Sequence, residues 1–308
     1  MASILITLLN FSIIMTITLA SESIPELYLT PMIKSNTTNE IRNVSKVKSD
    51  IFHMESYTGY LTVNKILNSN LFFWYIPAPG KDVLKTPWII WLQGGPGASS
   101  MFGLFKEVGP FRYKNNAIEI RGTSWCKNYS MVFIDNPVGA GFSFTDSDDG
   151  YPELIETYSE HLYIAVKQLV QLYPELGKTS LYIAGESYAG RYVPGLAMKI
   201  LDEQHNGQNL VDLEGLIMGN PTLDRDSIMD YISVFYNWGL IDAQGASAAK
   251  PMQEQFQMAI QRGDAVQAYD RATGPNISLR TERRGSTQEV ALDWQRRLPQ
   301  CSSHTLVL

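Results

Sequence analysis

The chemistry of this chain centres on Ser187, within the run LYIAGESYAG at residues 181–190. Four apolar residues of strand character lead into the turn, and a run rich in helix formers follows at residues 191–202. A strand, a sharp turn and a helix form a nucleophile elbow, which holds a serine in a strained conformation with its hydroxyl exposed. Gly185 supplies a small residue before the serine, but Ala189 replaces the second glycine of the strict G-x-S-x-G pattern. An ordinary surface serine in a strand-to-helix turn is the alternative interpretation.

A glycine-rich run, WLQGGPGASS at residues 91–100, leaves a second apolar strand and enters a predicted helix. Glycines let backbone N–H groups come close to a ligand. In α/β-hydrolases such a loop supplies one donor to the oxyanion, and the residue after the nucleophile supplies the other. Here those donors would be the N–H groups of Gly95 and Tyr188. A plain glycine-rich turn and a phosphate cradle are the alternatives, although no Gly-Lys-Ser/Thr follows.

A third run, DNPVGAGFS at residues 135–143, indicates by itself only the end of a strand and a tight loop.

These motifs need a sheet to position them, and the apolar pattern predicts one. The expected strands are Tyr57–Val63 and Asn70–Ile76, as an antiparallel pair, followed by Pro87–Leu92, Met131–Ile134, Leu181–Ala184 and Leu213–Met218. Apolar side chains three and four positions apart predict a helix over Pro152–Leu172. Strands that alternate with helices imply an α/β fold, with a mostly parallel sheet and helices on both faces.

Composition excludes several other classes of function. The 308 residues are 44% hydrophobic and 18% charged, which suits a packed core. The net charge of −6, without a basic cluster, gives no support for nucleic-acid binding. The four histidines (His53, His161, His205, His304) and the two cysteines (Cys126, Cys301) form no zinc or dithiol motif, so we expect neither a metal nor a cofactor.

The N-terminus predicts entry into the secretory pathway. Residues 4–19 are mostly apolar, are short for a membrane span, and end in small residues before Ser21. They indicate a signal peptide over residues 1–20, with an uncleaved anchor as the alternative. Four N-glycosylation sequons follow, at Asn36, Asn43, Asn128 and Asn276. We therefore expect a glycoprotein that is secreted or delivered to the lysosome or vacuole, without a membrane partner.

Taken together, the three motifs resemble those of the serine carboxypeptidase family. WLQGGPGASSMFGLFKEVGPF, FIDNPVGAGFSF and IAGESYAGRYVP carry the resemblance in this order and spacing. Gln93 and the runs SYTGYLTVN and SNLFFWYIPA are most similar to the vitellogenic-type members. The resemblance implies an α/β-hydrolase fold with a helical insertion, and removal of single residues from the C-termini of peptide or protein substrates.

The resemblance also implies a role for each motif residue. Ser187 would be the nucleophile, and the N–H groups of Gly95 and Tyr188 would form the oxyanion hole. The residues expected to bind the terminal carboxylate of the substrate are Gln93, Gly94, Glu107 and Glu186. Neighbouring carboxyl groups share protons, and in protonated form they donate hydrogen bonds, so activity would fade as the pH rises. Without the resemblance, Glu107 would be interpreted as an exposed helix residue.

The C-terminal part departs from the family. The expected Asp and His of a catalytic triad have no match after Ser187, and residues 271–308 turn polar and rich in arginine. The expected organisation is a signal peptide (1–20), an irregular arm (21–55), an α/β-hydrolase core (56–220), the start of a helical insertion (221–270) and an atypical, disordered tail (271–308), in a truncated chain. The expected insertion helices are 224–238 and 243–262. The alternatives are an inactive fragment, a non-catalytic binding remnant, or an acyltransferase or esterase on the same scaffold.

Processing of the N-terminus and glycosylation are directly testable. We expect material secreted by a eukaryotic host to begin near Ser21 and to lose mass on treatment with an N-glycosidase. The reason is that signal-peptide cleavage and N-glycosylation both take place in the secretory pathway. Mass spectrometry before and after the glycosidase measures both. An intact Met1 together with an unchanged mass would contradict the expectation.

Overall fold

The computed structural model describes most of the chain between residues 26 and 263. The described residues are 26–35, 37–48, 54–115, 117–223 and 230–263, with the backbone alone for 278–283, 286–291 and 305–307. The predicted leader, the sequons at Asn36 and Asn276, and the residues His53, Cys301 and His304 lie outside them.

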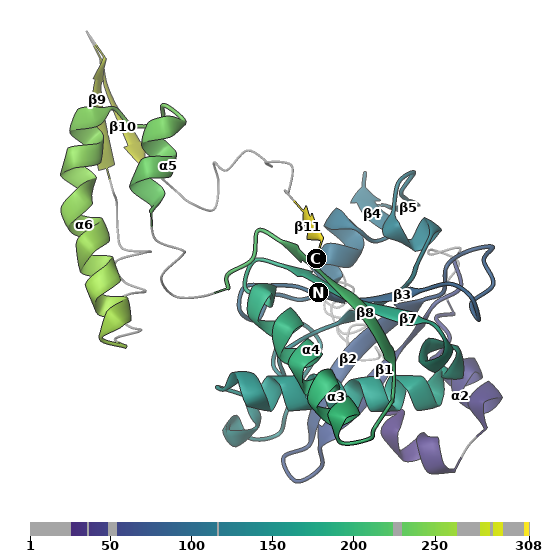
Figure 1. Ribbon diagram of the computed structural model, residues 1–308. Helices are drawn as coiled ribbons and strands as arrows, with labels where there is room; N and C mark the ends of the chain where they lie inside the picture. Colours follow the sequence, from purple (N-terminus) through teal and green to yellow (C-terminus); the bar gives the residue numbers. More distant parts are fainter. Residues whose placement is uncertain are drawn as a thin grey trace, which may run out of the picture.

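Within the described residues the core is one seven-stranded sheet in the order β1-β2-β6-β3-β7-β8-β11 (Figure 1). Its strands are β1 (Tyr57–Asn64), β2 (Ser69–Ile76), β3 (Trp88–Leu92), β6 (Ser130–Ile134), β7 (Ser180–Glu186), β8 (Asp212–Gly219) and β11 (Thr305–Val307). The four central strands β6, β3, β7 and β8 are parallel, whereas the pairs β1–β2, β2–β6 and β8–β11 are antiparallel. The α/β class predicted from the sequence is confirmed.

The central strands are apolar throughout because both faces of the sheet are covered. All five residues of β3 and all five of β6 are buried. Alternate residues enter different cores: Trp88, Ile90 and Leu92 join one buried cluster, while Ile89 and Trp91 join the other. Each fully buried side chain of this size contributes about 1.5–3 kcal/mol to stability.

Chain handedness decides what covers each face. Crossovers between parallel strands are right-handed, and β6 and β7 lie on opposite sides of β3, so the connections β3–β6 and β6–β7 must run over opposite faces. The segments on one face are α3 (Ile155–Leu172), η5 (Pro174–Lys178) and α4 (Ala189–His205). Those on the other are the π-helical turn η2 (Gly103–Glu107), the hairpin of β4 (Phe111–Lys114) and β5 (Ala117–Ile120), and η3 (Trp125–Lys127).

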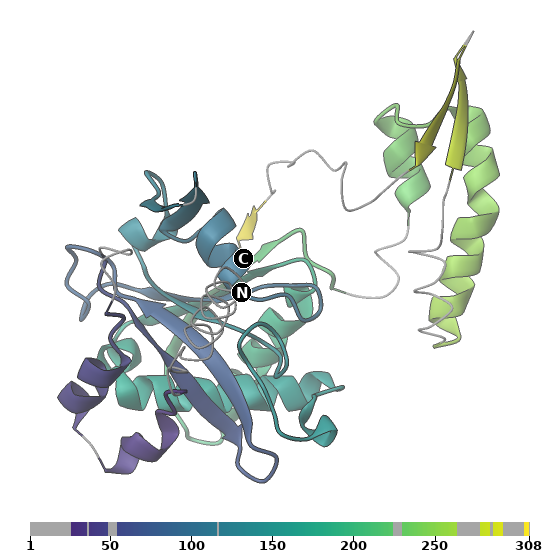
Figure 2. The same cartoon turned by 180° about the vertical axis from the view of Figure 1, so that it is seen from behind.

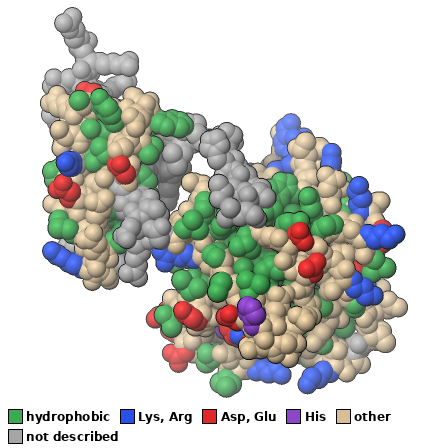
Figure 3. Space-filling view, viewed as in Figure 1, with side chains coloured by type: hydrophobic (Ala, Val, Ile, Leu, Met, Phe, Trp, Pro, Cys, Tyr) green, Lys and Arg blue, Asp and Glu red, His purple; other side chains and the backbone are tan. Residues whose placement is uncertain are grey.

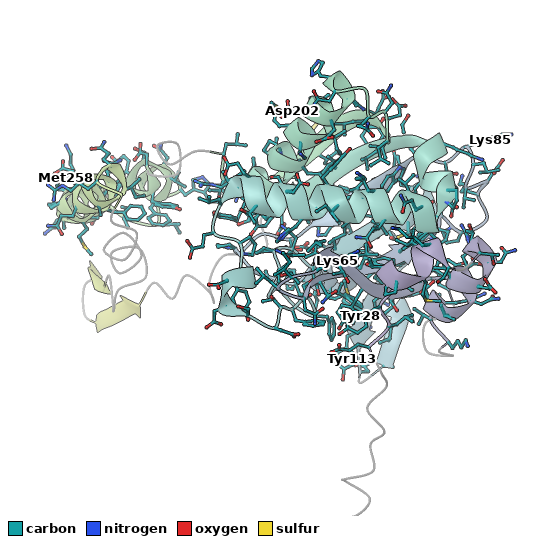
Figure 4. The ribbon with its side chains drawn as sticks, turned by 90° about the horizontal axis from the view of Figure 1, so that it is seen from below. Tyr28, Lys65, Lys85, Tyr113, Asp202 and Met258 are labelled. Atoms are coloured by element: carbon teal, nitrogen blue, oxygen red, sulfur yellow. The ribbon has the colours of Figure 1, made fainter. Side chains whose placement is uncertain are left out.

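Helical segments therefore lie on both faces, but unequally. Asp202 of α4 and Tyr113 of β4 lie on opposite sides of the molecule (Figure 4). The long helix predicted over 152–172 begins at Ile155, and the helix after Ser187 extends to His205. Pro194 lies inside α4, whose buried face, which includes Val193 and Leu196, keeps the segment helical.

The predicted irregular arm is partly wrong, because it contains the 3-10 turn η1 (Thr30–Lys34) and the helix α2 (Thr38–Ser45). A capping box starts α2: the Thr37 side chain accepts from the Glu40 N–H, and the Glu40 carboxylate accepts from the Thr37 N–H at 2.6 Å. Ile41 of α2 is buried in the hydrophobic core, and α2 contacts β1 and α3. The capping box Thr-Thr-Asn-Glu at residues 37–40 is short and lies in a polar segment, so the sequence pattern did not predict the helix.

The region predicted as an insertion contains α5 (Tyr231–Asn237) and α6 (Ala243–Gln261). Asp230 and Asp242 cap them by accepting from the N–H groups of Ser233 and Gly245. The start of the predicted helix 224–238, residues 224–229, lies outside the described residues. Figures 1 and 2 show α5 and α6 beside the core rather than packed into it.

The predicted disordered tail is also corrected, since it contains three strands. β9 (Ser278–Arg283) and β10 (Ser286–Ala291) form an antiparallel hairpin, and β11 pairs with the edge of β8. Ladder hydrogen bonds join backbone groups irrespective of side-chain periodicity, which is why a polar sequence without clear alternation does not exclude them.

Candidate active site

The sequence motifs meet where the parallel strands end. In parallel α/β sheets the crevice outside the carboxyl ends of strands, where neighbouring connections diverge to opposite faces, is the usual ligand site. The connections after β3 and β7 diverge in this way, because β3 is followed by a crossover to β6 on one side and β7 by a crossover to β8 on the other. Leu92 is paired with Gly185 in the last step of the β3–β7 ladder, so Gln93 and Glu186 leave the sheet side by side.

Ser187 has the backbone conformation predicted for it. Its φ of 57° lies in the left-handed region, which a non-glycine residue adopts only when its surroundings enforce it. Its N–H donates to the Gly219 carbonyl at 3.0 Å, and its carbonyl accepts from Gly190 at 3.0 Å and Thr222 at 2.8 Å. These bonds tie the turn to β8 and α4, and the serine is exposed. The elbow geometry predicted from the sequence is confirmed.

The small residues around the serine are required at particular points. A Cβ on Gly185 would lie 2.5 Å from the Leu92 carbonyl oxygen, and one on Gly190 would lie 2.7 Å from the Cβ of Pro221. Ala189 is fully buried, so this position accepts one methyl group. The departure from the strict pattern is therefore harmless, because the space is tight at residue 190 instead.

The glycine-rich loop packs directly on this elbow. A Cβ on Gly94 would lie 2.7 Å from the Tyr188 nitrogen, 2.7 Å from the Glu186 carbonyl oxygen and 2.8 Å from the Ser187 Cβ. Gly95 has a φ of 114°. Within the described part of the chain, the N–H groups of Gly95 and Tyr188 donate no hydrogen bond. Two unused donors thus stand on adjoining turns next to an exposed serine hydroxyl.

Gln93 connects the loop to the acidic side of the site. It is almost fully buried, and its Oε1 accepts from the Trp91 indole N–H at 3.0 Å. This bond fixes the orientation of the amide, so its Nε2 donates to the Glu186 Oε1 at 3.0 Å. Glu107, at the end of η2, lies against the same two side chains.

Glu107 holds its proton at neutral pH. Burial first, and then the negative charge of Glu186 and a hydrogen bond with it, raise the pKa of Glu107 to about 8. A hydrogen bond with Gln93 and the charge of Arg121 oppose this rise. The Arg121 guanidinium donates to the carbonyl oxygens of Glu107 and Phe105. The buried Oε2 of Glu107 has no hydrogen-bond partner in the described residues. The site therefore presents a neutral carboxyl group with unused hydrogen-bonding capacity.

The described histidines do not partner Ser187. His161 is buried in α3, where burial lowers its pKa. His205 is the last residue of the 17-residue helix α4, which places it roughly 25 Å along the helix from the elbow at 1.5 Å per residue. Neither makes a hydrogen bond with Ser187 in the part of the chain described here. Asp224 and Asp226, which follow Ser187 in the predicted insertion, lie outside the described residues.

Other predicted features are placed away from this crevice. Asn43 and Asn128 are exposed, as glycan acceptors must be. Cys126 is a buried free thiol whose pKa is raised by burial to about 12. The described residues hold no group of three His, Cys, Asp or Glu side chains arranged for a metal, and none of their helices has the length and apolarity to cross a membrane.

Comparison with known proteins decides the family. The model of the serine carboxypeptidase family matches residues 46–290. The chain belongs to the serine carboxypeptidase family. It is 40% identical over 246 residues to the venom serine carboxypeptidase of Apis mellifera, covering 79% of this chain and 52% of the relative. It is 43% identical over 226 residues to the vitellogenic carboxypeptidase of Aedes aegypti, covering 73% and 47%.

A solved carboxypeptidase structure has the same fold. The prohormone-processing carboxypeptidase Kex1Δp of Saccharomyces cerevisiae superposes with a TM-score of 0.66 and 24% identity, covering 75% of this chain and 56% of that one. The predicted resemblance is confirmed. The chain spans about half the length of the curated relatives it matches.

The proton on Glu107 should be visible in the pH dependence of stability. A folded-state pKa near 8 lies above the unfolded value, about 4.3. The stability that Glu107 contributes is fully present below the unfolded pKa and is lost as the pH rises through about 8. Glu107→Gln carries no titrating proton, so its Tm relative to wild type should rise between pH 4.5 and 8.5. Thermal unfolding across that range measures this.

The exposed Glu153 offers a matched control. Glu153→Gln should keep a constant Tm difference from wild type. Equal pH profiles for Glu107→Gln and Glu153→Gln would show that Glu107 does not retain its proton in the folded protein.

Proposed function

We propose that this chain carries the nucleophile and the carboxylate-binding part of a serine-type carboxypeptidase, which releases C-terminal amino acids from peptides through an acyl-enzyme at acidic pH. The observation that carries the proposal is the cluster of Glu107, Gln93 and Glu186 next to the exposed Ser187, in which burial and Glu186 raise the pKa of Glu107. An acidic pocket repels a peptide carboxylate unless it holds protons, and this one does below pH of about 8.

The roles follow from what each group can donate. Ser187 attacks the carbonyl carbon of the last peptide bond, and the unused N–H groups of Gly95 and Tyr188 stabilise the charge that develops on its oxygen. The carboxylate of the substrate binds at Gln93, Gly94, Glu107 and Glu186, where protonated carboxyl and amide groups donate to it. Glu186 directly precedes Ser187, so the attacked bond lies close to the bound terminus. This spacing accounts for removal of one residue at a time.

A second candidate function is binding of peptide C-termini without turnover. The absence of a histidine partner for Ser187 within the described residues favours it. A serine without its base retains only the help of the oxyanion hole and of substrate binding. An acyltransferase or esterase has less support, because neither reaction requires the proton held by Glu107.

The place of action proposed is the secretory pathway, with secretion or delivery to the lysosome or vacuole. The apolar leader and the exposed sequons at Asn43 and Asn128 support it. The relative from Apis mellifera is named as a venom protein, which agrees with secretion.

Binding of a peptide acid tests the site independently of turnover. The Kd of a short peptide with a free carboxylate should rise about tenfold per pH unit above the pKa of Glu107, because deprotonation places a second charge beside the ligand. The corresponding peptide amide should show no such rise. Calorimetry from pH 4 to 9 with wild type, Glu107→Gln and the control Glu153→Gln measures both ligands.

Glu107→Gln should flatten the profile for the acid, since an amide donates at every pH. A parallel rise for acid and amide would remove the carboxylate-binding role of these residues.

Hydrolysis tests the two functions against each other. We expect this chain to cleave a blocked dipeptide at pH 5 about 10⁴–10⁶-fold more slowly than the Aedes aegypti relative, because loss of a triad member costs about that much. The assay measures kcat for both proteins and for Ser187→Ala. Comparable turnover that Ser187→Ala abolishes would exclude the binding function and show that a base serves Ser187.

A further inference from the structure

The motif DNPVGAGFS has no role in the function proposed above, and its first residue is unusually placed. Asp135 directly follows the five buried residues of β6 and is itself fully buried. No lysine or arginine among the described residues forms an ion pair with it. A buried carboxylate needs compensation, and here backbone and hydroxyl donors supply it.

The carboxylate of Asp135 joins two loops. Its Oδ1 accepts from the Ser99 hydroxyl and from the Ser100 N–H, both at 2.7 Å. Its Oδ2 accepts from the Phe142 N–H at 2.9 Å. Burial raises the pKa of Asp135, and these hydrogen bonds oppose the rise. The Asp135 side chain thus binds both the glycine-rich loop, at Ser99 and Ser100, and the loop that follows β6, at Phe142.

Ser100 closes the glycine-rich loop on the same strand end. Its hydroxyl donates to the Ile134 carbonyl at 2.6 Å and accepts from the Gln93 N–H at 3.1 Å. Inside the loop the Ala98 N–H donates to the Gly94 carbonyl at 3.1 Å. The two ends of the loop, Gln93 and Ser100, are therefore both fixed against β6, and the glycines between them have little freedom.

The second loop is fitted to the same carboxylate. A Cβ on Gly141, which has a φ of 55°, would lie 2.1 Å from the Asp135 Oδ2 and 2.7 Å from the Ser99 Oγ. The Ser143 hydroxyl donates to the Asp135 carbonyl at 2.6 Å and accepts from the Phe72 N–H at 2.8 Å. The arrangement extends from β2 through β6 to the loop after β3.

The glycine-rich loop after β3 carries the Gly95 N–H, and Gly94 in the same loop packs against the turn of Ser187. We propose that Asp135 is a positioning residue for acyl transfer, which fixes residues 94–100 so that the Gly95 N–H stays aimed at the oxyanion formed at Ser187. The inference rests on the proposed function. Asp135 has no exposed surface, so it acts through the loop and not on the substrate.

The position of such a donor matters because an oxyanion-hole hydrogen bond is made only at the right distance. A misplacement of about 1 Å costs about 10²-fold in rate, as does removal of the donor. Asp135→Asn keeps the side-chain shape but sets an NH2 group against an N–H or hydroxyl donor. We expect this change to loosen the loop and to slow acylation of Ser187 about 10²-fold.

The experiment measures three quantities on the full chain. The first is the rate of Ser187 labelling by a fluorophosphonate, in which the serine oxygen attacks phosphorus and fluoride leaves. The second is the Kd of a peptide acid at pH 5, and the third is hydrogen exchange in peptides along the whole chain, which include residues 93–104, residues 135–143 and the helices α3 and α4. The variants are Asp135→Asn, Ser99→Ala, which removes one hydroxyl arm, and the control Asp149→Asn, an exposed aspartate beyond the same motif.

For Asp135→Asn we expect labelling about 10²-fold slower, a Kd within about twofold of wild type, and faster exchange confined to the two loops. Ser99→Ala should shift labelling in the same direction by less, and Asp149→Asn should match wild type. Unchanged labelling and exchange in Asp135→Asn would overturn the proposal. Faster exchange throughout α3 and α4 together with lost peptide binding would also overturn it, since that is a general structural role.

The two proposals fail differently. If wild-type Ser187 is not labelled at all, the nucleophile role in the proposed function fails. Exchange in residues 93–104 then decides the role of Asp135 alone: faster exchange confined to the loops supports its positioning of the loop, and unchanged exchange overturns it.

Discussion

The close approach of the turn after β3 to the turn after β7 is the constraint on which the site depends. Gly94 has no room for a Cβ beside the Tyr188 nitrogen and the Glu186 carbonyl oxygen. That contact requires a parallel pair of strands that end at the same level, and the β3–β7 ladder supplies it. It also requires the left-handed backbone of Ser187, which hydrogen bonds with Gly219, Gly190 and Thr222 hold in place. Packing therefore stores the local strain that exposes the serine.

The crevice contains two chemically different groups of side chains and backbone atoms. On one side stand uncharged donors, the N–H groups of Gly95 and Tyr188, and on the other stand carboxyl groups. Burial of Glu107 near Glu186 keeps a proton at a pH where an isolated glutamate would be charged. The same desolvation that costs stability makes a neutral hydrogen-bond donor available. In the function proposed above, a peptide with a free carboxylate one residue from the attacked carbonyl would match this polarity.

The core outside the crevice serves to hold three strand ends in register. The opposed connections around β3 follow from the handedness of crossovers, and they separate the two hydrophobic clusters. Hydrophobic side chains gather over β8 and α4 on the face shown in Figure 3. Two exposed hydrophobic residues of α4 are Met198 and Leu201. The crevice itself lies at the ends of central, fully covered strands.

Local patterns in the sequence are sufficient to predict the α/β class, strands β1, β2, β3, β6, β7 and β8, the elbow at Ser187 and the family. Each depends on residues close together in the chain: apolar runs, a turn with small neighbours, and motifs of fixed spacing. These patterns missed the helix α2, whose capping box is only four residues long, and the strands of the tail. The contact of Glu107 with Glu186, and the hydrogen bonds from Ser99 and Ser100 to Asp135, become visible only in the folded chain. The partners in these pairs lie tens of residues apart, and their protonation and hydrogen bonding depend on burial, which no local pattern records.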